Sequence, residues 1–285
     1  MVILNLYFLK FTKNFIKTLA NHITLSGFLK PNFVRTEHYL KSEPQNLTLF
    51  MLNYDDFTIE RATLLQNEMR KNISLKTLNK NITTIAGADI SHDVGSSRLF
   101  AGIVILSFPE LIPLSYSLAE GESKFEYKSE FLAFREVPTL LKAWEQIPNK
   151  PDLLILDGQG ITHPRQMGIA SHFGLLTDHP TIGCAKNMLH GEYSALEEEK
   201  FSICPIYKKG EKLGHALRTK KSVKPVFISP GHHMSVDDSI EIMLNTIQKY
   251  RIPEPTRHAH QMVNLFRTGQ RKAGYFELNC QLPLF

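Results

Sequence analysis

Three acidic residues stand where a hydrolytic metal site could form. Asp89 lies in an alternating stretch, Asp157 directly follows the unbroken apolar run Leu153–Leu156, and Glu136 stands between them at the expected start of a helix. Carboxylates that converge repel one another unless a hard divalent cation such as Mg²⁺ or Mn²⁺ binds them. Such cations promote phosphodiester hydrolysis by activating water and stabilising the leaving oxygen. The three acids are therefore a candidate site for metal-dependent phosphodiester cleavage.

These residues also have ordinary explanations. A single Asp on a strand is often a hydrogen-bonded or edge residue, and Asp-Gly after a strand is common turn chemistry. Asp93 lies on the same expected strand face as Asp89 and is an alternative to it. His163 and Lys186 also have ordinary explanations, as a hydrogen-bonded loop histidine and a solvated surface lysine. The adjacent pair His232-His233 lacks a partner at metal-ligand spacing, so we do not expect it to bind a metal ion.

The pattern around these residues predicts an α/β domain with a mixed sheet flanked by helices. In chain order we expect a helix over 57–72, strands over 84–91, 99–108 and 112–119, a helix starting near 135–138, a buried strand over 153–156, a helix over 166–176, a strand over 181–185, a hairpin within 212–228, and a last helix capped by Ser235 and Asp238. The predicted helix near 135–138 has Pro138 in its first turn. In open α/β sheets ligands bind beyond the carboxyl ends of the strands, which is where Asp157 is expected.

The composition excludes several other classes of protein. The chain has 285 residues, of which 42% are hydrophobic and 21% charged, so it is not a disordered chain. Lys10, Lys13 and Lys17 interrupt the most apolar segment, so we expect a soluble protein without membrane contact. Three cysteines without ligand spacing predict no disulfide framework and no zinc site, and they indicate a reducing, cytoplasmic location.

The N-terminal segment carries the excess positive charge. The formal net charge is +5, but residues 1–36 hold five basic residues and no acid, so the basic pI does not indicate nucleic-acid binding by the folded part. Three explanations stay open for this segment: a start codon assigned upstream of a true initiator at Met51, an amphipathic lead-in, or a targeting sequence. We therefore predict an N-terminal extension over 1–50, a catalytic domain over 51–267 and a C-terminal tail over 268–285.

Longer motifs resemble a known family. The run from Asp157-Gly-Gln-Gly through His163-Pro-Arg to Lys186 is similar to the signature of endonuclease V. The stretches Ile85-Ala-Gly-Ala-Asp89 and Phe131-Leu-Ala-Phe-Arg-Glu136 resemble its strand and helix motifs, and Pro253-Glu-Pro-Thr-Arg-His-Ala-His260 matches further on. The resemblance covers about residues 55 to 266 in consistent order. It implies an RNase H-like fold and nicking of nucleic acid near deaminated adenine.

The resemblance also implies roles for individual residues. Asp89, Glu136 and Asp157 would bind Mg²⁺, with Mn²⁺ as a substitute, and His260 would be a further metal ligand or would orient a metal-bound water. His163 would assist around the scissile phosphate and Lys186 would contact it. The family cuts the second phosphodiester bond 3′ to inosine without removing the base, so inosine-containing DNA is the expected substrate, and inosine-containing RNA is the open alternative.

A base-binding pocket is implied as well. Backbone amides at Leu132, Gly158 and Ile169 would read hypoxanthine, and the ring of Tyr127 would be the wedge. The chain departs from the family in two places. His260 stands where many members carry an aspartate, which changes the charge of the site by one, and Tyr127-Lys128-Ser129-Glu130 replaces Tyr-Ile-Pro-Gly, which removes a rigid turn and brings a negative charge near DNA.

The C-terminus suggests a protein partner. Gln281, Leu282, Leu284 and Phe285 resemble the peptide by which bacterial repair proteins dock on the DNA sliding clamp, although a terminal strand or a chance apolar end is the alternative. We expect a monomer. The alternative function is a weak or inactive homologue that binds nucleic acid without cutting, and retention of all three acids argues against it.

Overall fold

The structure, a computed structural model, describes residues 54–93 and 95–278. The described residues belong to one compact unit that begins at Tyr54. The predicted N-terminal extension and the clamp-like peptide at Gln281–Phe285 lie outside the described residues. Within the described part, the helices are too short or too polar to cross a membrane.

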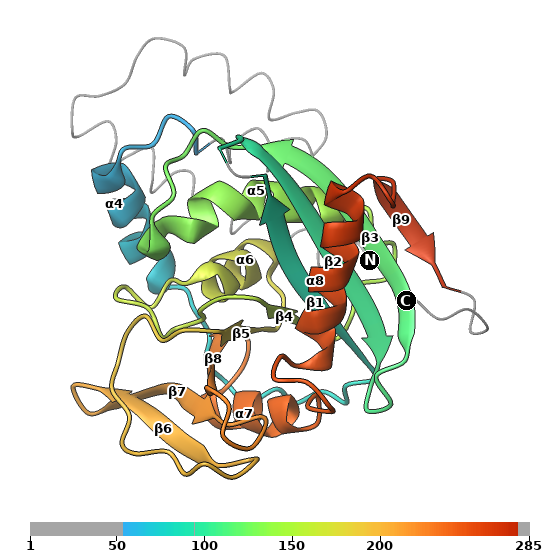
Figure 1. The fold of residues 1–285 in the computed structure, drawn as a ribbon. Coiled ribbons are helices and arrows are strands. Elements are labelled where there is room, and N and C mark those ends of the chain that lie inside the picture. The colour runs from blue at the N-terminus through green and yellow to red at the C-terminus, as the bar shows by residue number, and fades with distance from the viewer. Residues whose placement is uncertain (1–53, 94, 279–285) are drawn as a thin grey trace. The chain divides into compact units, whose positions relative to one another are not determined.

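A single mixed sheet organises the described unit (Figure 1). The strand order is β6-β7-β8-β5-β4-β1-β2-β3-β9, with β4 parallel to both β1 and β5 and the remaining neighbours antiparallel. The strands are β1 (Thr84–His92), β2 (Arg98–Ser107), β3 (Pro113–Glu122), β4 (Leu153–Leu156), β5 (Thr181–Ala185), β6 (Ile203–Lys208), β7 (Glu211–Leu217), β8 (Val226–His232) and β9 (Gly274–Glu277).

Helices cover both faces of this sheet (Figure 1). They are α4 (Ile59–Arg70), the 3₁₀ turn η2 (Ser129–Phe131), α5 (Leu132–Glu145), α6 (Ile169–Thr177), α7 (Val236–Leu244) and α8 (Glu254–Arg267). On one face α7 packs in a core with Ile85 and Ile155, and α8 packs on Phe100. On the other face Ser117 of β3 donates to the carbonyl of Ala143 in α5 at 2.7 Å. The fully buried strand β4 lies between these layers, as its continuous apolar run predicts.

Gly87 of β1 allows α8 to approach the sheet directly. A Cβ at this position would lie 1.9 Å from the carbonyl oxygen of Pro255 in α8. Any side chain there would push the helix away from the strand. The glycine therefore sets the distance between β1, which carries Asp89, and α8, which carries His260.

Most predicted elements are confirmed, and the differences have local causes. The helix predicted near 135–138 begins earlier, at Leu132, so Glu136 and Pro138 lie in its second turn and the predicted first-turn proline is wrong. The predicted cap is confirmed, because Ser235 accepts from the Asp238 amide at 3.0 Å. The last predicted helix is not the last one in the structure. Helix α8 follows it, and β6 and β9 were not predicted.

Candidate active site

Asp89 and Asp157 lie side by side at the centre of the sheet. Strands β1 and β4 are parallel neighbours with Ala88 opposite Leu156, and the Asp157 amide donates to the Ala88 carbonyl at 3.1 Å. The side chains of Asp89 and Asp157 are 9% and 15% exposed. Two carboxylates are thereby held together in a poorly solvated position.

Glu136 joins these two acids from α5. Removal from water, followed by the nearby Asp89 and Asp157 carboxylates, raises the pKa of Glu136 well above its ordinary value. Burial and the Asp89 carboxylate likewise raise the pKa of Asp157. The structure thus brings the three predicted acids into one cluster, where neighbouring carboxylates make ionisation of Glu136 and Asp157 less favourable.

Two basic side chains face the acids. The Lys186 ammonium, which follows β5, forms an ion pair with the Asp157 carboxylate. Burial lowers the pKa of Lys186, but the adjacent Asp157 outweighs it, so the net shift is upward. His260 of α8 donates from Nδ1 to Asp89 Oδ2 at 2.7 Å, and this bond raises the pKa of the imidazole. The three acids and the two basic residues beside them are called the acidic cluster below: Asp89, Glu136, Asp157, Lys186 and His260.

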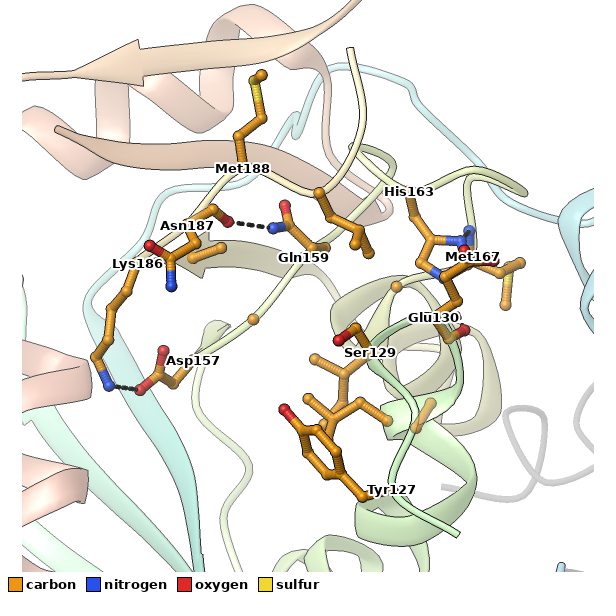
Figure 2. Close-up of a pocket in the computed structure, with 17 residues that line it drawn as sticks. Tyr127, Ser129, Glu130, Asp157, Gln159, His163, Met167, Lys186, Asn187 and Met188 are labelled. Atoms are coloured by element: carbon orange, nitrogen blue, oxygen red, sulfur yellow. Dashed lines mark hydrogen bonds and ion pairs between the residues drawn. The ribbon is translucent and has the colours of Figure 1, made fainter. Parts of the chain in front are cut away.

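His163 lies elsewhere. Figure 2 shows it across a pocket from Asp157 and Lys186. Its Nε2 donates to the Glu130 carbonyl at 2.8 Å, so Nδ1 is the acceptor for the amides of Arg165 at 3.2 Å and Met167 at 3.4 Å. Burial lowers the pKa of His163 to about 4. The ring is thus neutral and engaged with the backbone at both nitrogens, an arrangement that resembles a loop histidine more than a phosphate ligand.

A pocket of about 380 Å³ opens next to the acidic cluster (Figure 2). The four predicted base-binding residues all line it, and Tyr127 stands at its wall with a side chain that is 61% exposed. The other lining residues include Ser129, Glu130, Gln159, Met167, Asn187 and Met188. Asp157 lines the pocket as well, so pocket and cluster share a boundary.

The Asp157-Gly-Gln-Gly loop is fixed by polar contacts on both sides. Gln159 donates to the Asn187 carbonyl at 2.7 Å and accepts from the Thr162 hydroxyl at 2.6 Å. A Cβ at Gly158 would meet Cγ2 of Ile169 at 2.5 Å, so the glycine lets the start of α6 pack against the loop. The backbone of the pocket wall is held by these contacts.

Two other predicted positions have different roles. Asp93, the alternative to Asp89, pairs with Arg267 at 3.0 Å, away from the cluster. The expectation that the His232-His233 pair lacks a partner was wrong, because Asp178 lies beside it and the ligand atoms of all three are within 4.8 Å of one another. However, the Ser74 amide donates to His232 Nδ1 at 3.2 Å, so Nε2 carries the proton that faces Asp178. That protonation disfavours metal binding at His232.

Residues near the pocket that the sequence did not reveal include Gln66 and Arg165. The expected negative charge of Glu130 is compensated, because Arg165 Nη1 lies 2.8 Å from its carboxylate. Gln66 is fully buried on the face of α4 that also buries Ala62 and Met69. A glutamine at a core position of an amphipathic helix is the signal that could have identified it.

The donor types of the acidic cluster suit a hard divalent cation, because Asp89, Glu136 and Asp157 offer carboxylate oxygens, the ligand type that Mg²⁺ and Mn²⁺ prefer. In the described residues these three carboxylates do not lie within 4.8 Å of one another, as Asp178, His232 and His233 do. The low exposure of Asp89 and Asp157, 9% and 15%, is the observation that supports the fit, since a divalent cation would offset the cost of burying two adjacent carboxylates. Both ring nitrogens of His260 are engaged, Nδ1 with Asp89 at 2.7 Å and Nε2 with Asn264 at 3.2 Å, so this residue orients the Asp89 carboxylate instead of adding a ligand atom.

Known proteins share this sequence and architecture. Residues 67–261 match the family model described as Endonuclease V. The Endonuclease V of Myxococcus xanthus is 43% identical over 223 residues, which are 78% of this chain and 95% of the relative. That of Dictyoglomus turgidum is 50% identical over 201 residues, or 70% of this chain and 87% of the relative.

Solved structures agree with these matches. The Endonuclease V of Streptomyces avermitilis has a TM-score of 0.71 at 36% identity, covering 76% of this chain and 96% of the other. The Ciona intestinalis Endonuclease V, crystallised with a 24mer DNA containing an inosine followed by a ribo-adenosine, has a TM-score of 0.65 at 25% identity, covering 75% and 99%. The mixed sheet flanked by helices is therefore the predicted RNase H-like fold. The chain belongs to the endonuclease V family.

Proposed function

We propose that this protein is a Mg²⁺-dependent endonuclease that nicks DNA, and also RNA, at the second phosphodiester bond 3′ to inosine. The observation that carries the proposal is the shared boundary between the acidic cluster and the pocket, where Asp157 and Gly158 are consecutive residues. A group that acts on phosphate and a surface that accepts a base are thus adjacent. Relatives crystallised with inosine-containing DNA support the same substrate class.

The pocket favours hypoxanthine over adenine. Leu132 and Ile169 are the first residues of α5 and α6. The Ile169 amide has no acceptor within its own helix, whereas the Leu132 amide directly follows the 3₁₀ turn η2. The N-terminus of α6 and the junction of η2 with α5 meet at one pocket, where N–H groups would face a base that carries an oxygen acceptor. Hypoxanthine has a carbonyl oxygen where adenine has an amino donor. These amides would therefore donate to hypoxanthine and would have no acceptor on adenine. The target base would leave the stack to reach them.

The acidic cluster supplies the cutting chemistry. Asp89, Glu136 and Asp157 would hold the cation, and His260 would keep the Asp89 carboxylate in position through its hydrogen bond. A bound Mg²⁺ supplies a Lewis acid that activates water and stabilises the leaving oxygen. The Lys186 side chain, 41% exposed, offers a positive charge to the phosphate at the edge of the cluster. His163 would stabilise the pocket wall and not contact the phosphate.

Cleavage mapping tests the proposal. Labelled single strands and duplexes with one inosine, or adenine at the same position, are incubated with Mg²⁺ or with EDTA. We expect a cut at the second bond 3′ to inosine with 3′-hydroxyl and 5′-phosphate ends, and none with adenine or EDTA. Equal cutting of the inosine-containing and adenine-containing substrates, or a cut at another phosphodiester bond, would contradict the proposal. Binding without any cut would favour the inactive homologue.

An Asp157→Asn variant separates the two halves of the site. The amide keeps the size of the carboxylate but removes one charge from the cation site, so cleavage should be lost. Binding of an inosine strand, measured by fluorescence anisotropy, should stay within about threefold of wild type, because the base-reading amides belong to the backbone. Cleavage within tenfold of wild type would show that Asp157 is not a metal ligand.

We also propose that the C-terminal peptide binds the bacterial DNA sliding clamp. Gln281, Leu282, Leu284 and Phe285 form a short peptide with the apolar residues that a sliding-clamp pocket accepts. We also propose that the protein acts as a monomer in a reducing, cytoplasmic compartment, which agrees with the free buried thiols of Cys184 and Cys204.

A further inference from the structure

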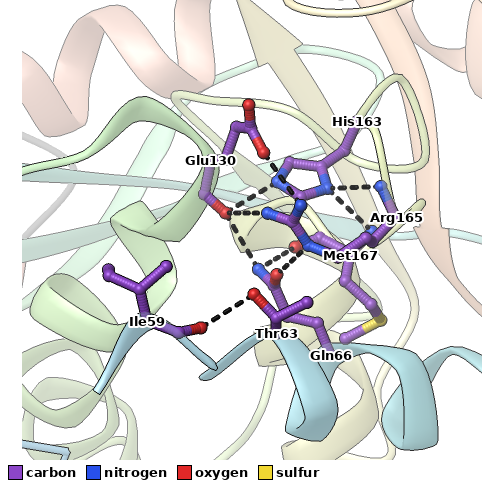
Figure 3. A network of polar contacts seen from close by, with 7 residues as sticks. All are labelled: Ile59, Thr63, Gln66, Glu130, His163, Arg165 and Met167. Atoms are coloured by element: carbon purple, nitrogen blue, oxygen red, sulfur yellow. Dashed lines mark hydrogen bonds and ion pairs between the residues drawn. The ribbon is translucent and has the colours of Figure 1, made fainter. Parts of the chain in front are cut away.

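We propose that Gln66 and Arg165 are positioning residues that set base specificity by holding the backbone of Glu130 at the pocket wall. The inference rests on the proposed function, since it names side chains that make the pocket selective. These two residues and His163 are called the Glu130 clamp below (Figure 3). None of the three belongs to the acidic cluster.

The carbonyl oxygen of Glu130 receives three side-chain donors. Gln66 Nε2 lies at 2.9 Å, His163 Nε2 at 2.8 Å and Arg165 Nη2 at 3.4 Å. A carbonyl oxygen has two lone pairs, so this acceptor is fully used. The three donors come from α4 and from the loop after β4, which are far apart in the sequence. They join at one peptide group of the pocket wall.

The donors are themselves fixed in orientation. Arg165 Nε donates to Gln66 Oε1 at 2.5 Å, which forces the amide of Gln66 to point its nitrogen at Glu130. That nitrogen also donates to the Met167 carbonyl at 3.3 Å. Arg165 further pairs with the Glu130 carboxylate at 2.8 Å and lies 4.6 Å above the ring of Phe131. The Glu130 clamp thus fixes both the backbone and the side chain of this residue.

The clamped residue controls the start of α5. Glu130 is in the centre of η2, and Leu132, which lines the pocket, follows two residues later. Side-chain hydrogen bonds to the Glu130 carbonyl restrict this turn. Loosening it would move the Leu132 amide relative to the other pocket amides.

The effect of such movement is on selection of the base. An N–H group that selects a carbonyl oxygen must stay within hydrogen-bond distance of it. The cation ligands Asp89 and Asp157 are held by β1 and β4, and Glu136 lies in the second turn of α5, beyond the clamped turn. In the described residues none of these three acids shares a hydrogen bond or ion pair with the Glu130 clamp. We therefore expect KM and the inosine-to-adenine ratio to change while kcat at saturating inosine strand is largely kept.

Three variants test the clamp. Gln66→Leu removes the buried amide at similar volume, Arg165→Met removes the guanidinium, and Arg165→Lys keeps the charge opposite Glu130 without the fork. The matched control is Thr63→Val on the same helix, since the Thr63 hydroxyl donates to the Ile59 carbonyl at 2.7 Å and does not reach Glu130 (Figure 3). Thermal melting shows whether each variant folds. If Gln66→Leu does not fold, Arg165→Met tests the inference alone, because Arg165 is partly exposed and its replacement disturbs the core less.

Kinetics give the first readout. For Gln66→Leu and Arg165→Met we expect KM for the inosine strand to rise about tenfold and the inosine-to-adenine ratio of kcat/KM to fall about tenfold, with kcat within about threefold. Arg165→Lys should recover part of the ratio, and Thr63→Val should match wild type. A loss of kcat alone, with KM and ratio unchanged, would overturn the inference.

Hydrogen exchange gives a readout that does not depend on the substrate. The Phe131 amide, which donates to the Lys128 carbonyl at 2.8 Å, reports the integrity of the turn. Exchange over 127–132 should be faster in both disruptive variants and unchanged in Thr63→Val. Unchanged exchange would overturn the clamp whatever the substrate is. A wild-type protein without inosine preference would instead overturn the proposed function, and the exchange result would still decide whether the clamp holds the turn.

Discussion

Replacing Glu136 by Gln should make the protein more stable and nearly inactive. Burial and the neighbouring Asp89 and Asp157 raise the pKa of Glu136, so folding disfavours its ionised form and this carboxyl group lowers the stability of the fold at neutral pH. A neutral glutamine of the same size relieves the repulsion from Asp89 and Asp157. Gains from such relief are about 1 kcal/mol, which raises Tm by about 2–4 °C in a domain of this size.

The cation should reverse this order of stability. A ligand at 100 times its Kd stabilises the folded state by about 2.7 kcal/mol, or about 5–11 °C in Tm. Wild type should gain this amount when Mg²⁺ is added, and Glu136→Gln should gain much less because one carboxylate ligand is missing. Cleavage should fall about a thousandfold, equal to about 4 kcal/mol of transition-state stabilisation.

Melting curves with EDTA and with Mg²⁺, together with single-turnover cleavage, test these expectations. The control is Glu145→Gln near the other end of α5, where burial also raises the carboxyl pKa but no second acid is involved. It should cut normally. The reasoning is refuted if Glu136→Gln melts below wild type in EDTA, or if it cuts within tenfold of wild type.

Four further outcomes are expected. Gly87→Ala should lower stability by about 3 kcal/mol in urea unfolding, because its Cβ would overlap the Pro255 carbonyl; an unchanged midpoint would show that α8 can move. Asp152→Asn should lower stability by about 2 kcal/mol at pH 7. Despite partial burial, which raises it, hydrogen bonds from Lys80 and from backbone amides hold the pKa of Asp152 below its ordinary value. Its contribution to folding stability is therefore present above the unfolded-state pKa of 3.8, and the stability difference between wild type and Asp152→Asn should shrink as the pH falls below that value. A stability difference that does not change with pH would contradict this. A chain starting at Met51 should fold and cut normally, and an insoluble or inactive product would show that upstream residues are needed. Deleting Gln281–Phe285 should leave cleavage of short strands unchanged while abolishing binding to the purified sliding clamp, and equal clamp binding by both proteins would exclude the peptide.

The sequence predicted the part of the site that depends on strand ends. The apolar run of β4 stops at Asp157, and a buried strand in an α/β sheet ends at the ligand-binding edge, so this residue could be located without coordinates. The motif resemblance assigned Lys186 and His260 to the same region. The start of α5 was missed because Pro138 was taken as a first-turn residue, whereas it is tolerated one turn later.

Contacts between distant segments could not be predicted. The bond between His260 and Asp89 joins residues 171 positions apart and requires the close packing of α8 on Gly87. The contacts of Glu130 with Arg165 depend on where two loops meet in space, which periodicity does not encode. Helix α8 itself had a readable signal in the helical spacing of Ala259, Val263 and Phe266 after an N-terminal proline.

The adjacency of Asp157 and Gly158 has a geometric consequence. One peptide unit spans from the cluster to the pocket wall, and such a unit covers no more than about 3.8 Å between Cα atoms. The separation between the cluster and this part of the pocket wall is therefore a backbone dimension, independent of rotamers, and with the proposed function it would help to fix the offset between the recognised base and the broken bond. Side-chain substitutions would alter the rate or the choice of base but leave the offset constant, whereas inserting one residue after Asp157 would displace the cut along the strand.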